Sequence, residues 1–571
     1  MEKVDIRQKS IEIQNIISRY TKESFVCFFA DFIRHNPERN QLGFSRNLKS
    51  KLRDSLYLIM LRLSSTNEGK EVLVFTDNVD KNLRKVADIL SLIVDFYLGD
   101  IYFKDFNEIK DERHKTLIHE MAFKDYFQNG ILNYREQELN KVIRLFYPYR
   151  DKIRERLGID FKSLIEICQY SEEYYRKKSI QSKSFAFENE FAKFTRNSFN
   201  GTIPQNEFLT EFSDLPDNIQ NDFLDFYERP HSCLLFKKKD YYELFDKNEV
   251  DIFCELFSLS LNDNYDILFY SQSNPLDTKP IIKISDTEYL NVYQKQLPTA
   301  LYNLLYATLS TTDKEKEQLN LRRGKVILES HTREIFEKFF RKSKHLKVFS
   351  NYYVNGNPEE KDLLIIANGN AFVIECKSSR YREPRRDLNQ AFQRIKSDFN
   401  DCIQKGYEQC YQVEQLILNC PKISIQSNNS VQELETSYIK DIFSIVVTSE
   451  RFATIQSDLG LLLKKQSDDI YPWSVSIDDL EIFLKTLKLE FNNPSKRFAV
   501  FLEYRELLNE RLFARDELDV CALYLNNPMN FKNLCESSDH IVTDPLLQQY
   551  FDKLYFSKKL KFNILDSSSL K

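Results

Sequence analysis

Two carboxylates and a lysine stand at the ends of two neighbouring apolar runs. Asp362 begins the run DLLIIA, and Glu375 and Lys377 lie at the end of the run AFVIECK. The tripeptide Asn-Gly-Asn centred on Gly369 separates the runs and is a strong signal for a hairpin turn. Such a hairpin brings Asp362 alongside the end of the second strand, where alternation places Glu375 and Lys377 on one face.

These residue types fit metal-assisted hydrolysis of a phosphodiester bond. Asp362 and Glu375 offer the hard oxygen ligands that Mg²⁺ or Mn²⁺ accepts. A metal held there polarises the phosphoryl oxygen and lowers the pKa of a bound water. Lys377 is a compact cation that can orient this water and stabilise charge on the phosphoryl group. We therefore predict that all three residues are catalytic and that the two carboxylates bind the metal.

A non-functional interpretation of the same residues is that Asp362 belongs to a turn and that Glu375 and Lys377 form an exposed ion pair. Surface pairs of this kind are common and contribute little. The Glu-x-Lys pattern also occurs at Glu68, Glu108 and Glu359, so the pattern alone is weak. Its position at the end of paired apolar strands favours the catalytic interpretation.

The elements around these residues follow a recognisable order. Periodicity predicts a helix over 324–342, three strands over 346–354, 362–367 and 371–376, a long polar helix over 387–418, and a strand within 442–450. This order resembles the PD-(D/E)XK nuclease superfamily, which has the restriction-endonuclease-like fold, and in particular its bacterial Mrr/NERD-type members. The resemblance covers about residues 321–450. One departure is that Lys361, and not proline, precedes Asp362.

The resemblance implies a DNase in which a helical glutamate helps to hold the metal. Glu329 matches that position best, and Glu334 and Glu337 on the same predicted helix are alternatives. A glutamine on the helix that follows the site often assists. Three residues qualify and the sequence does not choose among them: Gln404, Gln409 and Gln412.

A basic segment follows directly after the predicted site. Its arginines could contact phosphates on either side of the scissile bond. The alternative is a solvated loop and helix start, which is what most charge runs are. The predicted DNA-binding residues are Arg380, Arg382, Arg385, Arg386 and Arg394.

The fold class expected for the whole chain is a multidomain α+β protein. A mixed sheet of restriction-endonuclease-like topology, flanked by helices, lies between a large, mostly helical N-terminal region and a helical C-terminal region. The expected divisions are a helical domain over 1–204, a mixed region with a hairpin over 205–320, the nuclease domain over 321–455, and a helical region over 456–571. The polar run STTDKEKEQ (310–318) is the strongest boundary signal.

Composition excludes several other classes. The net charge of −5 opposes a purely electrostatic DNA binder. The chain has no apolar stretch long enough for a membrane span, no signal-peptide pattern and no phosphate-loop motif. The ten cysteines include no CxxC pair, which indicates reduced thiols in a cytoplasmic protein. Arg113–His114 followed by His119 matches the Arg-x(4–6)-His pattern of HEPN-type ribonucleases, at about the frequency expected by chance.

The sequence therefore predicts an Mg²⁺- or Mn²⁺-dependent endodeoxyribonuclease, and the resemblance implies a role in bacterial restriction or phage defence. The principal alternative is a non-catalytic scaffold that binds nucleic acid or protein on a nuclease-like fold. A ribonuclease acting through Arg113 and His119 is a weaker alternative. The expected partners are DNA and, through the N-terminal helical region, a second copy of the chain or another protein.

Overall fold

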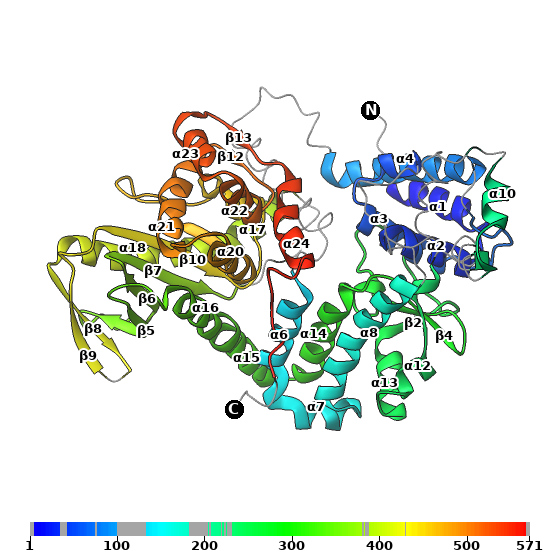
Figure 1. The fold of residues 1–571 in the computed structure, drawn as a ribbon, viewed down its shortest axis with the longest axis horizontal. Helices are drawn as coiled ribbons and strands as arrows, with labels where there is room; N and C mark the ends of the chain where they lie inside the picture. Colours follow the sequence, from blue (N-terminus) through cyan, green and yellow to red (C-terminus); the bar gives the residue numbers. More distant parts are fainter. Residues whose placement is uncertain are drawn as a thin grey trace. The chain divides into compact units, whose positions relative to one another are not determined.

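The computed structural model describes residues 5–34, 43–74, 77–99, 133–181, 204, 207–217, 220–221, 224, 231–379, 382, 388–428 and 430–566 (Figure 1). These residues form two compact units. The first holds the described residues up to Thr311 together with Asp566, and the second runs from Thr312 to Leu565. Within this part of the chain, no helix has the length and hydropathy needed to cross a membrane.

The first unit is mainly helical, as predicted for the N-terminal region. Its helices begin at polar caps: the Asp5 carboxylate accepts the Gln8 N–H, and the Ser50 hydroxyl accepts the Arg53 N–H. The helices are α1 (Ile6–Ile17), α2 (Lys22–Arg34), α3 (Lys51–Leu63), α4 (Asp77–Gly99), α6 (Arg135–Phe146), α7 (Arg150–Leu157), α8 (Phe161–Gln181), α10 (Phe208–Ser213), α12 (Lys238–Tyr242), α13 (Lys247–Phe257) and α14 (Gln296–Leu309).

A small four-stranded sheet completes the first unit. Its strands are β1 (Leu235–Lys237), β2 (Ser258–Ser260), β3 (Ile281–Lys283) and β4 (Glu288–Asn291), in the order β1-β4-β3-β2. Strands β3 and β4 pair antiparallel, which confirms the hairpin predicted within residues 281–293.

The second unit is built on a seven-stranded mixed sheet in the order β11-β10-β7-β6-β5-β8-β9. Strands β7, β10 and β11 are parallel to one another, and the other pairs are antiparallel. The mixed α/β class is thereby confirmed. The strands are β5 (Lys347–Val354), β6 (Lys361–Ala367), β7 (Asn370–Lys377), β8 (Lys422–Ser427), β9 (Ser430–Glu435), β10 (Asp441–Thr448) and β11 (Trp473–Ser476).

Helices cover both faces of this sheet. Helix α18 (Lys405–Asn419) packs on one face, where Cys410 and Val413 meet Leu364 and Val373. Helices α16 (Ser330–Phe340), α20 (Ile477–Glu490) and α21 (Pro494–Arg505) belong to the other face. There the ring of Phe372 lies 4.8 Å from that of Phe340 and 5.8 Å from that of Phe498, between ring centroids.

The remaining elements of the second unit are mostly C-terminal. The boundary expected at residue 455 falls between β10 and β11, which are neighbouring strands of one sheet.

The further elements are α15 (Asp313–Arg322), the π-helical segments η6 (Arg323–Glu329) and η7 (Asn400–Gln404), α17 (Leu388–Phe399), α19 (Thr454–Ser457), α22 (Glu517–Asn526), α23 (Pro528–Ser537), α24 (Gln549–Phe556), β12 (Leu512–Phe513) and β13 (Ile541–Val542).

Candidate active site

Strands β6 and β7 stop pairing through their backbones where the predicted carboxylates begin. The regular ladder runs from Ala367↔Asn370 to Leu363↔Ile374. It starts at the predicted turn, in which Asn368 and Gly369 both adopt positive φ, of 54° and 85°. Beyond the last pair, carboxylate side chains take the place of backbone carbonyls as acceptors. We call this end of the β6–β7 pair, where side chains replace the backbone ladder, the opening.

Asp362 and Glu375 converge in that opening. The Cys376 N–H donates to Asp362 Oδ2 at 2.6 Å, and the Asp362 N–H donates to Glu375 Oε1 at 3.3 Å. Each carboxylate is thus fixed by the backbone of the opposite strand. The Glu375 side chain is only 1% exposed, whereas that of Asp362 is 16% exposed.

The ammonium of Lys377 lies against both acids. Its Nζ is 2.9 Å from Glu375 Oε2 and 3.9 Å from Asp362 Oδ2, and the side chain is 15% exposed. Its aliphatic stem passes helix α18 at Gly406, where a Cβ atom would lie 3.4 Å from Lys377 Cγ and 2.7 Å from Val446 Cγ1. The absence of a side chain at Gly406 therefore lets the helix approach the strand that carries the lysine.

Burial and charge set the protonation of the group. Burial, and then the charge of Asp362, raise the pKa of Glu375 to about 7, although Lys377 acts in the opposite direction. Burial by itself lowers the pKa of Lys377, but the charges of Glu375 and Asp362 outweigh it, so the pKa of the ammonium is raised. Lys377 therefore stays charged at neutral pH, and Glu375 is the member of the pair that can exchange a proton.

Glu329 lies beside this group without joining it. It ends the π-helical segment η6, directly before α16, and its Oε2 is 3.5 Å from the amide of Asn351. Burial, and then the charge of Asp362, raise the pKa of Glu329. The helix predicted over 324–342 therefore begins as a π-helical segment, and the extra residue in a π turn rotates the side chains that follow it.

The three candidate glutamines have other partners. The Gln404 amide donates to Glu408 and to the Lys464 carbonyl, and the Gln409 amide donates to Glu359. Gln412 Oε1 accepts from Lys361 Nζ at 2.6 Å.

Two features of the site carried no signal in the sequence. Lys361, in the position before Asp362, is a buried lysine whose Nζ lies 2.8 Å from Glu359 Oε2. Tyr352, which is paired with Lys361 across β5 and β6, is fully buried. Its hydroxyl has no hydrogen-bond partner among the described residues, and its pKa is raised by burial and then by the charge of Glu375. Tyr352 and Lys361 face each other across the consecutive strands β5 and β6, and Lys361 also contacts Gln412, which is 51 positions away in the sequence.

The predicted DNA-binding arginines are only partly described. Arg382 is bound to Asp398, with its Nε 2.8 Å from Asp398 Oδ1. Arg394 lies half-buried on α17. Residues that lie outside the described ranges are Arg380, Arg385, Arg386, Arg113, His114 and His119.

The donor set suits a hard divalent cation. Asp362 and Glu375 present carboxylate oxygens to one opening, and Mg²⁺ is commonly held by one or two carboxylates together with waters and substrate phosphates. In the described part of the chain, no three His, Cys, Asp or Glu side chains lie close enough together to hold a metal ion by themselves. A cation at this site would therefore rely on water or substrate oxygens for its other ligands.

Comparison with known families identifies the same segment. Residues 328–449 match the family model of the nuclease-related domain, NERD. The match confirms the family resemblance and covers β5, β6, β7, α18 and β10. No curated protein and no solved structure matches the chain.

Proposed function

We propose that this protein is a divalent-metal-dependent nuclease that hydrolyses DNA phosphodiester bonds at Asp362, Glu375 and Lys377. The observation that carries the proposal is the convergence of two carboxylates and an ammonium where β6 and β7 separate, inside the segment that matches the nuclease-related domain. Charges placed against a sheet of Ile, Val and Leu cost free energy unless they are paired or bind a ligand. The Lys377 ammonium pairs with Glu375 at 2.9 Å and lies 3.9 Å from Asp362, so one cation faces two carboxylates, and a bound metal ion would offset the excess negative charge.

Asp362 and Glu375 are the residues that would hold the cation. Their mutual repulsion, seen in the raised pKa of Glu375, is what a divalent cation would relieve. When bound, the cation would supply Lewis-acid polarisation of the phosphoryl group and a water of lowered pKa. The charge of Asp362 raises the pKa of Glu329, so the two carboxylates interact, and Glu329 would contact the cation through a water molecule.

Lys377 supplies the positive charge of the chain itself. Its ammonium has three donors, of which one faces Glu375 at 2.9 Å. The remaining donors can orient the attacking water and contact a non-bridging phosphoryl oxygen. The charge that grows on those oxygens in the transition state is then stabilised at a position that exposes little of the lysine to solvent.

We also propose that the seven-stranded sheet has the restriction-endonuclease-like fold. The antiparallel strands β5 and β6, the parallel strands β7 and β10, and the helices on both faces support this assignment. The choice of DNA as substrate and a role in restriction or phage defence rest on the family resemblance and belong to this proposal.

Metal binding distinguishes an enzyme from a scaffold that keeps only the fold. We expect Mn²⁺, titrated into the full-length protein and followed by electron paramagnetic resonance, to bind the wild type. Binding should be lost in Asp362→Asn, because the change removes one of the two negative charges that would hold the cation. Lys377→Met should retain binding, since the lysine is not a ligand. If Asp362→Asn bound Mn²⁺ as tightly as the wild type, the metal would lie elsewhere and the assignment of the site would fail.

A further inference from the structure

A group of cations gathers where helices α16 and α20 end. The segment from the end of α16 to the start of β5 reads KFFRKSKHLK, and α20 contributes one more lysine near its own end. Each of these cationic side chains is exposed. We call the group the α16 patch, and it consists of Lys338, Arg341, Lys342, Lys344, Lys347 and Lys488.

The two elements bring their charges together in space. Lys488 Nζ donates to the Lys338 carbonyl at 3.1 Å, which joins the end of α20 to the last turn of α16. Burial, and then the charges of Arg341 and Lys342, lower the pKa of Lys488. The lysine is therefore held among like charges, which is unfavourable in the absence of an anion.

Carboxylates do not compensate this group. None of the six side chains forms an ion pair with another described residue, whereas acids on the same helices have partners elsewhere. Glu337 pairs with Arg333, and Glu481 pairs with Lys485. Ordinary protein surfaces intersperse both signs of charge. In a chain whose net charge is −5, an uncompensated cationic surface indicates a polyanionic partner.

We propose that the α16 patch binds the sugar-phosphate backbone of DNA at a distance from the scissile bond. This inference rests on the proposed nuclease function. The Lys344 N–H donates to Asn368 Oδ1 at 2.9 Å, so the patch lies at the turn end of β7, and Glu375 and Lys377 lie at the opposite end. Eight residues of strand span roughly 25 Å. That length corresponds to about 7 base pairs of B-DNA at about 3.4 Å each.

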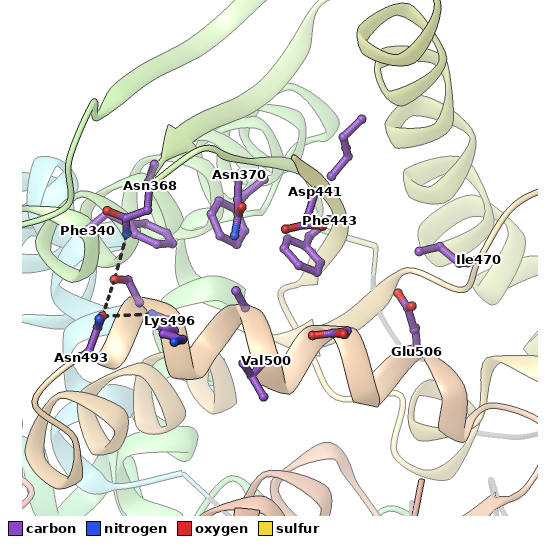
Figure 2. A pocket seen from close by; sticks show the side chains of 16 residues that line it. Phe340, Asn368, Asn370, Asp441, Phe443, Ile470, Asn493, Lys496, Val500 and Glu506 are labelled. Atoms are coloured by element: carbon purple, nitrogen blue, oxygen red, sulfur yellow. Dashed lines mark hydrogen bonds between the residues drawn. The ribbon is translucent and has the colours of Figure 1, made fainter. Parts of the chain in front are cut away.

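A pocket of about 580 Å³ borders the patch and marks where the cationic surface ends. Figure 2 shows Asn368, Asn493 and Lys496 at one end of the pocket and Ile470 and Glu506 at the other. At the first end the polar groups are linked, because the Asn368 amide donates to Ser495 Oγ at 3.0 Å.

The two ends of the pocket differ in what they offer a phosphate. The first end joins the patch and adds the ammonium of Lys496. The other end carries the carboxylate of Glu506, which repels a phosphate backbone. The DNA path inferred here therefore runs over the end that holds Asn368 and Lys496.

The test compares two triple variants of the full-length protein that lose the same charge. The patch variant is Arg341→Gln/Lys342→Gln/Lys344→Gln. The control, Lys162→Gln/Lys405→Gln/Lys532→Gln, removes lysines that are paired with Glu166, Asp401 and Glu536. Five of the six positions are solvent-exposed and Lys532 is partly exposed, so both variants should fold, and thermal melting checks that they do. Binding of a fluorescein-labelled 30-base-pair duplex is followed by anisotropy in EDTA over a range of KCl concentrations.

We expect the patch variant to lose three phosphate contacts. The slope of log Kd against log[KCl] should fall by about 2.7, since each contact contributes about 0.9. At 0.1 M KCl the Kd should rise about 500-fold, because a slope difference of about 2.7 acts over one decade of salt below about 1 M, where such contacts fade. The control should bind as the wild type does. A DNA hairpin with a 4-base-pair stem, about 14 Å long at about 3.4 Å per base pair, is too short to span both ends of β7 and should distinguish the two triple variants much less.

Several results would overturn the inference. They are wild-type duplex affinity and salt slope in the patch variant, an equal loss in the control, and an equal loss with the hairpin of 4 base pairs. Wild-type protein that binds no duplex would also overturn it. So would a patch variant that loses affinity only for phosphatidylserine vesicles or for a polyglutamate peptide. Because binding is measured in EDTA, the proposed DNA-binding patch is tested separately from the proposed nuclease activity. DNA binding that depends on the patch, in a protein that cleaves no DNA with Mg²⁺, would support the patch and refute the catalytic site.

Discussion

Replacing Lys377 by methionine tests how the charge of the site is used. Methionine keeps most of the unbranched stem that passes Gly406 and removes the ammonium. The variant loses the group that would stabilise transition-state charge, a contribution typically worth about 10²–10³-fold in rate for one donor. We therefore expect single-turnover cleavage of a labelled duplex with Mg²⁺ to fall by at least about 100-fold.

The same change has a pH-dependent effect on stability that follows from Glu375. The pKa of Glu375 is already raised to about 7 in the presence of Lys377, and it must rise further without it. A raised pKa in the folded protein gives stability that is present at low pH and is lost as the pH rises through that pKa. The wild type completes this loss near pH 7, whereas the variant continues to lose about 1.4 kcal/mol per pH unit above it. At pH 8.5 the difference should therefore reach at most about 2 kcal/mol, below the roughly 3–5 kcal/mol for breaking a buried pair.

Urea denaturation in EDTA at pH 6 and pH 8.5 measures this difference. Lys405→Met is the matched control, because Lys405 Nζ lies 2.8 Å from Asp401 in an ion pair that is 61% exposed at the lysine. It should change the free energy of unfolding by less than about 1 kcal/mol at both pH values. A cleavage rate equal to the wild type in Lys377→Met, or a stability loss that is the same at pH 6 and pH 8.5, would refute the reasoning.

Three further predictions concern packing and burial. Gly406→Ala should gain about 1 kcal/mol of helix propensity but lose about 1–3 kcal/mol because the new Cβ atom would lie 2.7 Å from Val446 Cγ1. The urea midpoint should therefore not rise, and a higher midpoint would contradict this close contact. Asp54, whose pKa burial raises to about 6, loses about 3 kcal/mol of stabilisation as the pH rises from 4 through 6. Asp54→Asn keeps an acceptor for the Tyr270 hydroxyl and has no carboxylate to ionise. The free energy of unfolding of this variant, relative to that of the wild type, should therefore increase from pH 4 to pH 6. A difference that is the same at both pH values would contradict the prediction. Tyr352→Phe removes a buried hydroxyl that has no hydrogen-bond partner among the described residues. The free energy of unfolding should be unchanged or rise by up to about 1 kcal/mol. A lower free energy of unfolding in a urea titration would show that the hydroxyl has a hydrogen-bond partner.

Local signals were sufficient for the strands that carry the site. The apolar runs and the Asn-Gly-Asn turn predicted β6 and β7 to within one residue, and the structure then places Asp362 beside Glu375. Strong alternation and a turn with one favoured geometry fix such a hairpin without help from distant residues. The part of the site that lies on a single hairpin was therefore predictable.

Features that depend on distant packing were not predicted. Strand β11 has only four residues and exists because β10 pairs with it, and β9 is almost entirely exposed. The π-helical segments η6 and η7 interrupt helices that the periodicity predicted as continuous, and each ends at a proposed site residue, Glu329 or Gln404. The α16 patch joins residues from α16 and α20 that are about 150 positions apart in the sequence.

The central claim is that Asp362 and Glu375 make this protein a metal-dependent nuclease, and plasmid cleavage tests it most directly. Supercoiled plasmid is incubated with full-length protein in Mg²⁺, in Mn²⁺ and in EDTA, beside Asp362→Asn prepared in the same way. We predict nicked or linear DNA from the wild type with either metal, none in EDTA, and none from Asp362→Asn under any condition. Cleavage that persists in EDTA, or equal cleavage by the wild type and Asp362→Asn, would contradict the assignment.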